Sequence, residues 1–185
     1  IKPQFMERLL AHAREWISAN PLDPTTRIGA MVDHIQMEQV LNYIAIGQQE
    51  GAKLLLGGKR TQPEEGGYYI EPTIFDDVTP TMRIFREEIF GPVLAVTGFD
   101  TLEEAIALGN DTDYGLAAAI WTADLNQAVK GSRALRAGTV FVNNWDGGDM
   151  TMPFGGFKQS GNGRDKSLHA LEKYTELKST WIQLE

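Results

Sequence analysis

Two neighbouring acidic residues, Glu87 and Glu88, are the first candidates for chemistry in this chain. They stand beside Phe90 and a Gly-Pro turn, directly before a long apolar segment. A carboxylate can accept hydrogen bonds from two hydroxyl groups at once, as the acidic residue of dinucleotide folds does with a ribose. The alternative is a solvated turn in which Glu87 or Glu88 pairs with Arg83 or Arg86, and the spacing alone favours this alternative.

A second group of candidates follows a strand-like run that ends at Asn143. Trp145, Asp146 and Asp149 place an indole and two carboxylates within five residues. Such a set can hold a cationic or polar group through charge and cation–π contact. The alternative is a capped turn whose aspartates are solvated.

The stretch 150–164 is rich in glycine and contains Phe154. Glycine at this density indicates unusual backbone dihedrals or the close approach of another group. One interpretation is a loop that lines a substrate pocket with Phe154 as its apolar wall. The other is a structural turn that connects a sheet to the C-terminal tail, and the pattern favours neither.

Composition excludes several classes of function. The chain has 185 residues, of which 42% are hydrophobic, so it can bury a core. Its net charge of −8 argues against nucleic acid as a partner. It has no cysteine for a disulfide or a thiolate metal site, and its three histidines show no metal-ligand spacing. No apolar run approaches the length of a membrane span. We therefore expect a cytoplasmic protein without a bound metal, and a start without methionine suggests a fragment of a longer one.

Apolar periodicity and punctuation predict the elements of the first half. The first is a helix over 6–17 that Asn20-Pro21 stops. The second is a helix from Asp33 to Gly51, with Gln36 in the capping-box position and an apolar stripe of Val40, Leu41 and Ile44. A strand over 53–56 and an edge strand or bulge at Pro72 within 68–75 follow.

The second half alternates strands and helices. The predicted strands are 93–99, 116–122 and 139–143. The predicted helices are 101–109, which begins with a capping box of Thr101 and Glu104, and 124–138, which Asp124 and Gln127 start. Leu125, Ala128 and Val129 face inward in the second helix. This β-α-β-α-β order predicts an α/β fold: an open, mostly parallel sheet with helices on both faces. The glycine-rich loop then leaves the carboxyl end of a strand, where such sheets bind ligands. The tail over 175–185 is strand-like and needs a pairing partner.

Four motifs in order carry a family resemblance. They are Glu87-Glu88-Ile89-Phe90-Gly91-Pro92-Val93, the run 110–116, the run 138–143, and Pro153-Phe154-Gly155-Gly156-Phe157-Lys158-Gln159-Ser160-Gly161. Together they resemble the C-terminal part of the NAD(P)-dependent aldehyde dehydrogenase superfamily, over essentially the whole chain. The run 161–173 is most similar to the bacterial gamma-glutamyl-gamma-aminobutyraldehyde dehydrogenases.

The resemblance implies oxidation of an aldehyde to a carboxylic acid with NAD or NADP. In the family a cysteine attacks the aldehyde, a hydride leaves to the nicotinamide, and water activated by a glutamate hydrolyses the resulting thioester. The resemblance puts that cysteine, the general base and the main cofactor domain outside this chain, so no catalytic residue is assigned within it. It implies a truncated catalytic domain over 1–172 and an oligomerisation strand over 173–185. The parent enzyme is then expected to be a homo-oligomer. We expect the parent enzyme to be active and this chain alone to be inactive.

Individual roles also follow from the resemblance. Glu88 matches the glutamate that holds the nicotinamide ribose, and Phe90 matches an aromatic residue near the nicotinamide. The loop 144–152, which includes Asn144, matches the variable loop at the substrate entrance, and Phe154 matches a residue of the aromatic substrate pocket. Because Trp145, Asp146 and Asp149 lie in this loop, we expect an aldehyde that carries an amine or amide. The alternative function is a non-catalytic binding or assembly module.

Overall fold

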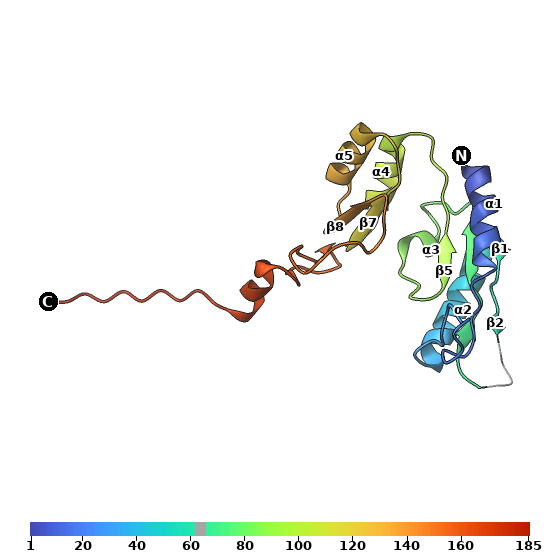
Figure 1. Ribbon diagram of the computed structural model, residues 1–185, viewed down its shortest axis with the longest axis horizontal. Helices are drawn as coiled ribbons and strands as arrows, with labels where there is room; N and C mark the ends of the chain where they lie inside the picture. The colour runs from blue at the N-terminus through green and yellow to red at the C-terminus, as the bar shows by residue number, and fades with distance from the viewer. Residues whose placement is uncertain (62–65) are drawn as a thin grey trace. The chain divides into compact units, whose positions relative to one another are not determined.

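The computed structural model describes residues 1–61 and 66–185, and these form two compact units, Ile1–Gly98 and Phe99–Glu185. Each unit combines helices with a small sheet (Figure 1). Among the described residues, no helix is both long enough and apolar enough to cross a membrane.

The first unit is built on a three-stranded sheet in the order β1-β4-β5. Its elements are α1 (Lys2–Ala13), α2 (His34–Gln49), β1 (Lys53–Leu56), β2 (Arg60–Thr61), β3 (Tyr69–Ile70), β4 (Thr73–Asp76), α3 (Arg83–Arg86) and β5 (Val93–Ala95). Strand β4 pairs antiparallel with β1 and parallel with β5, and β2 pairs with β3. Met37, Val40 and Ile44 of α2 form one buried cluster with Phe75 of β4, so α2 covers the sheet.

The start and end of α2 agree with the sequence. The Asp33 side chain accepts a hydrogen bond from the Gln36 N–H at 2.8 Å and caps the helix. After the helix, Gly51 takes a φ of +97°, a left-handed conformation that glycine adopts without strain.

The predicted helix over 6–17 is too long, because α1 ends at Ala13. The Ile17 carbonyl accepts hydrogen bonds from the N–H groups of Arg27 and Ile28, and Ser18 forms a bridge with Ile28. The main chain after Ala13 therefore pairs with a later loop, and this leaves the side chains of Trp16 and Ile17 exposed.

Pro72 does not lie within an edge strand. It falls between β3 and β4, and β4 is the central strand of its sheet. Because the ladder starts after Pro72, the missing N–H of proline is not needed there. The predicted strand over 93–99 is also too long, because β5 ends at Ala95. It pairs with β4, which starts directly after Pro72 and was therefore not predicted to be a central strand.

The second unit contains the predicted β-α-β arrangement. Its elements are α4 (Leu102–Asn110), β6 (Tyr114–Gly115), β7 (Ala117–Ile120), α5 (Leu125–Ala134), β8 (Thr139–Val142), β9 (Phe157–Lys158) and the 3₁₀ helix η1 (Leu168–Tyr174). Strands β7 and β8 are parallel with α5 between them, and β6 pairs antiparallel with β9. Thr101 and Asp124 cap α4 and α5 as the sequence predicted.

Helix α5 ends at Ala134 rather than near Gly138, and it buries small residues instead of the predicted mixed stripe. Leu125 and Val129 are 76% and 41% exposed, whereas Ala128 is buried. A Cβ on Gly131 would lie 2.6 Å from the Ile120 side chain, so the helix approaches β7 too closely for larger residues.

The C-terminal tail, residues 175–185, has no regular secondary structure (Figure 1). Its apolar side chains, Leu177, Trp181, Ile182 and Leu184, are exposed. A strand here requires a partner from elsewhere, so the oligomerisation strand stays a prediction.

Candidate functional site

The segment 87–91 lies along one face of α2 and alternates in exposure. Glu87 is half-buried and Ile89 is buried, whereas Glu88 and Phe90 are exposed. Alternation of this kind is expected of extended backbone. The segment therefore attaches to the core through Glu87 and Ile89 and leaves Glu88 and Phe90, the two predicted cofactor residues, exposed.

Glu87 makes the attachment at the start of this segment. Its carboxylate accepts two hydrogen bonds from the Arg83 guanidinium, both 2.8 Å long, and one from the Tyr43 hydroxyl at 2.7 Å. The Arg83 guanidinium and the Tyr43 hydroxyl lower the pKa of the Glu87 carboxyl to about 2. The hydrogen bond between the Tyr43 hydroxyl and the Glu87 carboxylate raises the pKa of that hydroxyl. Glu87 is thus the ion-paired acid that the sequence offered as an alternative.

Glu88 remains available to a ligand. Among the described residues, its carboxylate has no hydrogen-bond or ion-pair partner. Phe90 is 72% exposed and takes a φ of +56°, an unusual conformation for an aromatic residue. Both side chains are thus accessible to a ligand.

Gln36 is a residue of this site that the sequence interpretation missed. Its amide donates to the carbonyl oxygens of Ile89 and Phe90 at 3.3 and 3.0 Å. The capping-box pattern assigned this side chain to the start of α2. The signal that identifies it is spacing, since Gln36, Val40 and Tyr43 lie at i, i+4 and i+7 on the helix face that meets the segment.

The predicted substrate loop begins where β7 and β8 end, and Asn143 fixes its start. The Asn143 side chain accepts a hydrogen bond from the Thr122 N–H at 2.8 Å and donates one to the Thr122 carbonyl at 2.9 Å. Asn143 has a φ of +56°, which asparagine tolerates better than most residues. These bonds continue the pairing of the two strands beyond their last residues.

Asn144, Trp145 and Asp146 follow directly and are exposed. The Trp145 ring packs against Phe141 of β8, with ring centroids 5.6 Å apart. Asp146 has a φ of +56° and no partner for its carboxylate among the described residues. This part of the loop therefore presents an indole and an unpaired negative charge at the carboxyl end of β8.

Asp149 is differently engaged, because its carboxylate turns back onto the loop. It accepts hydrogen bonds from the N–H and the hydroxyl of Thr151, at 2.7 and 2.5 Å. The Thr151 hydroxyl and N–H lower the pKa of the Asp149 carboxyl. This is the capped turn that the sequence offered as the alternative for these aspartates.

Phe154 and the glycines after it are held close to β8. Phe154 exchanges backbone hydrogen bonds with Asp165, and the Lys166 ammonium lies 5.8 Å from the centre of its ring. A Cβ on Gly138 would lie 1.7 Å from the Gly155 carbonyl oxygen. The stretch thus contains a structural turn beside the half-buried Phe154 side chain.

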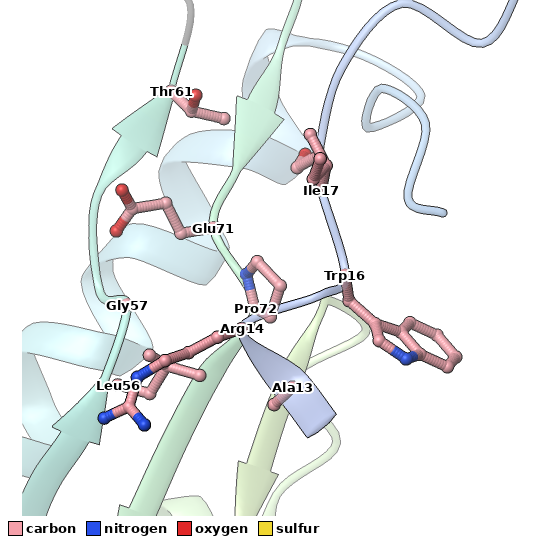
Figure 2. A pocket seen from close by; sticks show the side chains of 10 residues that line it. Ala13, Arg14, Trp16, Ile17, Leu56, Gly57, Thr61, Glu71 and Pro72 are labelled. Carbon is pink, nitrogen blue, oxygen red and sulfur yellow. The ribbon is translucent and has the colours of Figure 1, made fainter. Parts of the chain in front are cut away.

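The first unit also contains a separate pocket of about 290 Å³ between the end of α1 and the ends of β1 and β3 (Figure 2). Arg14 and Glu71 point to the same side in Figure 2, whereas the Trp16 ring points away from them. The residues that line this pocket are different from all of the predicted site residues.

The structure therefore groups the candidate residues by unit. Glu88 and Phe90 are exposed residues of one short segment in the first unit. Asn144, Trp145, Asp146, Asp149 and Phe154 belong to one continuous loop in the second.

Comparison with known proteins gives the same family from sequence and from structure. The family model described as "Aldehyde dehydrogenase family" matches residues 1–180. The NADP/NAD-dependent aldehyde dehydrogenase PuuC of Escherichia coli (strain K12) is 52% identical over 185 residues, which are 100% of this chain and 37% of that protein.

Two solved structures are closely similar. An indole-3-acetaldehyde dehydrogenase in complex with NAD+ has a TM-score of 0.95 and 63% identity, covering 100% of this chain and 37% of that one. The gamma-glutamyl-gamma-aminobutyraldehyde dehydrogenase of Burkholderia cenocepacia J2315 has a TM-score of 0.93 and 60% identity, covering 97% of this chain and 36% of that one. The chain thus spans little more than a third of these relatives.

Proposed function

This chain belongs to the aldehyde dehydrogenase family, and we propose that it is the truncated catalytic domain, residues 1–172, and the oligomerisation strand, residues 173–185, of a longer enzyme. That longer protein, called the full-length enzyme below, oxidises an aldehyde to a carboxylic acid with NAD+ or NADP+. The cofactor, when bound, accepts the hydride. In this proposal the attacking cysteine lies outside the chain, which itself contains none.

We assign the cofactor contact to Glu88 on the basis of one observation. Glu88 is exposed and unpaired among the described residues, while its neighbour Glu87 is fully engaged. An unpaired carboxylate fits the two hydroxyls of a ribose, since it can accept from both. Phe90, exposed two residues further along the segment, supplies an apolar surface. The NAD+ complex of a relative that is 63% identical to this chain supports this proposal.

The test compares the chain with the full-length enzyme. We expect the full-length enzyme to reduce NAD+ or NADP+ with an aldehyde and the isolated chain to produce no reduced cofactor. If the isolated chain produces NAD(P)H at a rate that Glu88→Ala abolishes, the assignment of the nucleophile to a region outside the chain is wrong.

We propose an aldehyde that bears an amine or amide as the substrate. Asp146 and Trp145 offer an unpaired carboxylate and an exposed indole at the carboxyl end of β8, and both interact favourably with a cation. The name of the Burkholderia relative supports the same class. Equal kcat/KM for 4-aminobutyraldehyde and butyraldehyde in the full-length enzyme would argue against it.

A second candidate function is an assembly module, which the exposed tail favours. Leu177 and Trp181 are 107% and 92% exposed, and a strand here would bury them against another copy. Light scattering after size exclusion, with and without the residues after Lys173, tests this. Monomers in both cases, at high concentration, would reject it.

A further inference from the structure

The Tyr43–Arg83–Glu87 cluster lies beside the proposed cofactor contact without being part of it. Its hydrogen bonds and ion pair end on the Glu87 carboxylate, one residue before Glu88. We infer that Tyr43 and Arg83 are positioning residues for cofactor binding, because they fix the side of the segment to which Glu88 points. This inference rests on the proposed function.

The geometry of the cluster leaves Glu87 a single orientation. Arg83 binds it through two nitrogen atoms, Nε and Nη2, the fork geometry that fixes a carboxylate in plane as well as in distance. The Arg83 guanidinium also lies 5.4 Å from the centre of the Tyr43 ring, so the two donors support each other. The backbone N–H of Arg83 donates a hydrogen bond to the Glu50 carboxylate at 2.7 Å, and this bond connects α3 to the end of α2.

The backbone transmits this orientation to Glu88. Glu87 has φ −103° and ψ 145°, an extended conformation in which the next side chain points to the opposite face. Glu88 is accordingly exposed while Glu87 faces α2. If Glu87 is released, rotation of this residue becomes possible and Glu88 loses its defined direction.

Stability alone does not account for such a cluster. The Arg83 and Glu87 side chains are 48% and 39% exposed, and ion pairs at this exposure contribute little to folding. The core contacts of Ile89 and the close approach of Gly91 to Val40 already hold the segment on α2. What the cluster adds is orientation at the first residue of the segment, which reduces the entropy lost when a ligand binds.

The test uses the full-length enzyme and its Tyr43→Phe, Arg83→Met and Arg83→Lys variants. Direct binding of NAD+ or NADP+ is measured by calorimetry, next to KM and kcat. We expect the dinucleotide Kd and KM to rise about fivefold in Tyr43→Phe and Arg83→Met, with the aldehyde KM and kcat within about twofold. Arg83→Lys should recover part of the loss, and the double variant should lose less than the product of the single effects.

Lys130→Met is the matched control, because Lys130 forms an exposed ion pair with Glu103 in the other unit. The inference is overturned if the dinucleotide Kd of Tyr43→Phe and Arg83→Met stays within twofold of wild type. It is also overturned if Lys130→Met has the same effect, or if the loss follows the fall in thermal stability. A wild-type enzyme that binds neither dinucleotide would instead reject the proposed function, and this inference with it.

Discussion

Glu87 and Glu88 are adjacent in the chain, yet their carboxylates lie in opposite environments. Glu87 accepts three hydrogen bonds from Tyr43 and Arg83, whereas Glu88 is exposed and has no partner among the described residues. The extended backbone between them separates a structural acid from one that can bind a ligand. The two residues should therefore respond differently to mutation.

Glu87 should make the stability of the first unit depend on acidic pH. Its pKa in the folded chain is about 2, below its ordinary value, so its contribution is complete above pH ~5 and is lost as pH falls through about 2. Because the side chain is 39% exposed, solvent screens the effect to about 1 kcal/mol or less. Urea unfolding at pH 6 and pH 3 should show a smaller pH effect in Glu87→Gln than in wild type. Glu7→Gln, at an exposed position of α1, is the control and should behave as wild type.

Asn143 should stabilise the start of the loop 144–152 through the two hydrogen bonds of its side chain to Thr122. Asn143→Gly keeps the left-handed backbone conformation accessible and removes only the two hydrogen bonds, so we expect it to lower the free energy of unfolding by about 1 kcal/mol. Asn143→Ala adds the cost of a left-handed conformation for alanine and should lower the free energy of unfolding by about 2 kcal/mol. Chemical unfolding checks both, and a glycine variant as stable as wild type would show that the two bonds contribute nothing.

Gly138 should tolerate no side chain. A Cβ there would lie 1.7 Å from the Gly155 carbonyl oxygen, so Gly138→Ala must displace the glycine-rich loop. We expect it to lower the free energy of unfolding by about 3 kcal/mol. Gly161→Ala is the control: Gly161 has a φ of +93° and open space around it, which leaves only a backbone cost of about 1 kcal/mol. Equal losses would contradict the close contact.

Asp146 and Asp149 should contribute unequally to substrate preference. In the full-length enzyme, Asp146→Asn should lower the kcat/KM ratio of 4-aminobutyraldehyde to butyraldehyde about fivefold, since the unpaired charge is lost. Asp149→Asn should change that ratio less than about twofold, because Asp149 already accepts two bonds from Thr151. The reverse order would assign recognition to Asp149.

The sequence predicted elements well where the decisive residue was local. Asp33, Thr101 and Asp124 cap their helices as expected, and the parallel pair β7–β8 lies where apolar runs alternate with a helix. The predictions were wrong where pairing with a distant part of the chain determines the bounds or the partner of an element. The backbone of Ile17 pairs with residues 27–28 and shortens α1, and β5 pairs with a strand that starts directly after Pro72.

Sequence motifs gave the candidate site residues, but they could not show which of these residues have partners in the fold. Motifs identified the pair of acids and the loop after Asn143. Spacing could not tell Glu87 from Glu88, or Asp146 from Asp149, because the partners that engage one member of each pair come from the fold. Tyr43 lies 44 residues before Glu87 in the chain, and only packing of α3 against α2 brings them together.

Calorimetric titration of the full-length enzyme with NAD+ and NADP+ measures whether the Glu88 carboxylate holds the cofactor. Wild type and the Glu7→Gln control should bind one of the dinucleotides with the same Kd, and Glu88→Gln should weaken binding about tenfold, because a neutral amide holds two ribose hydroxyls less well. A Kd in Glu88→Gln within twofold of wild type would contradict the proposed role of this carboxylate.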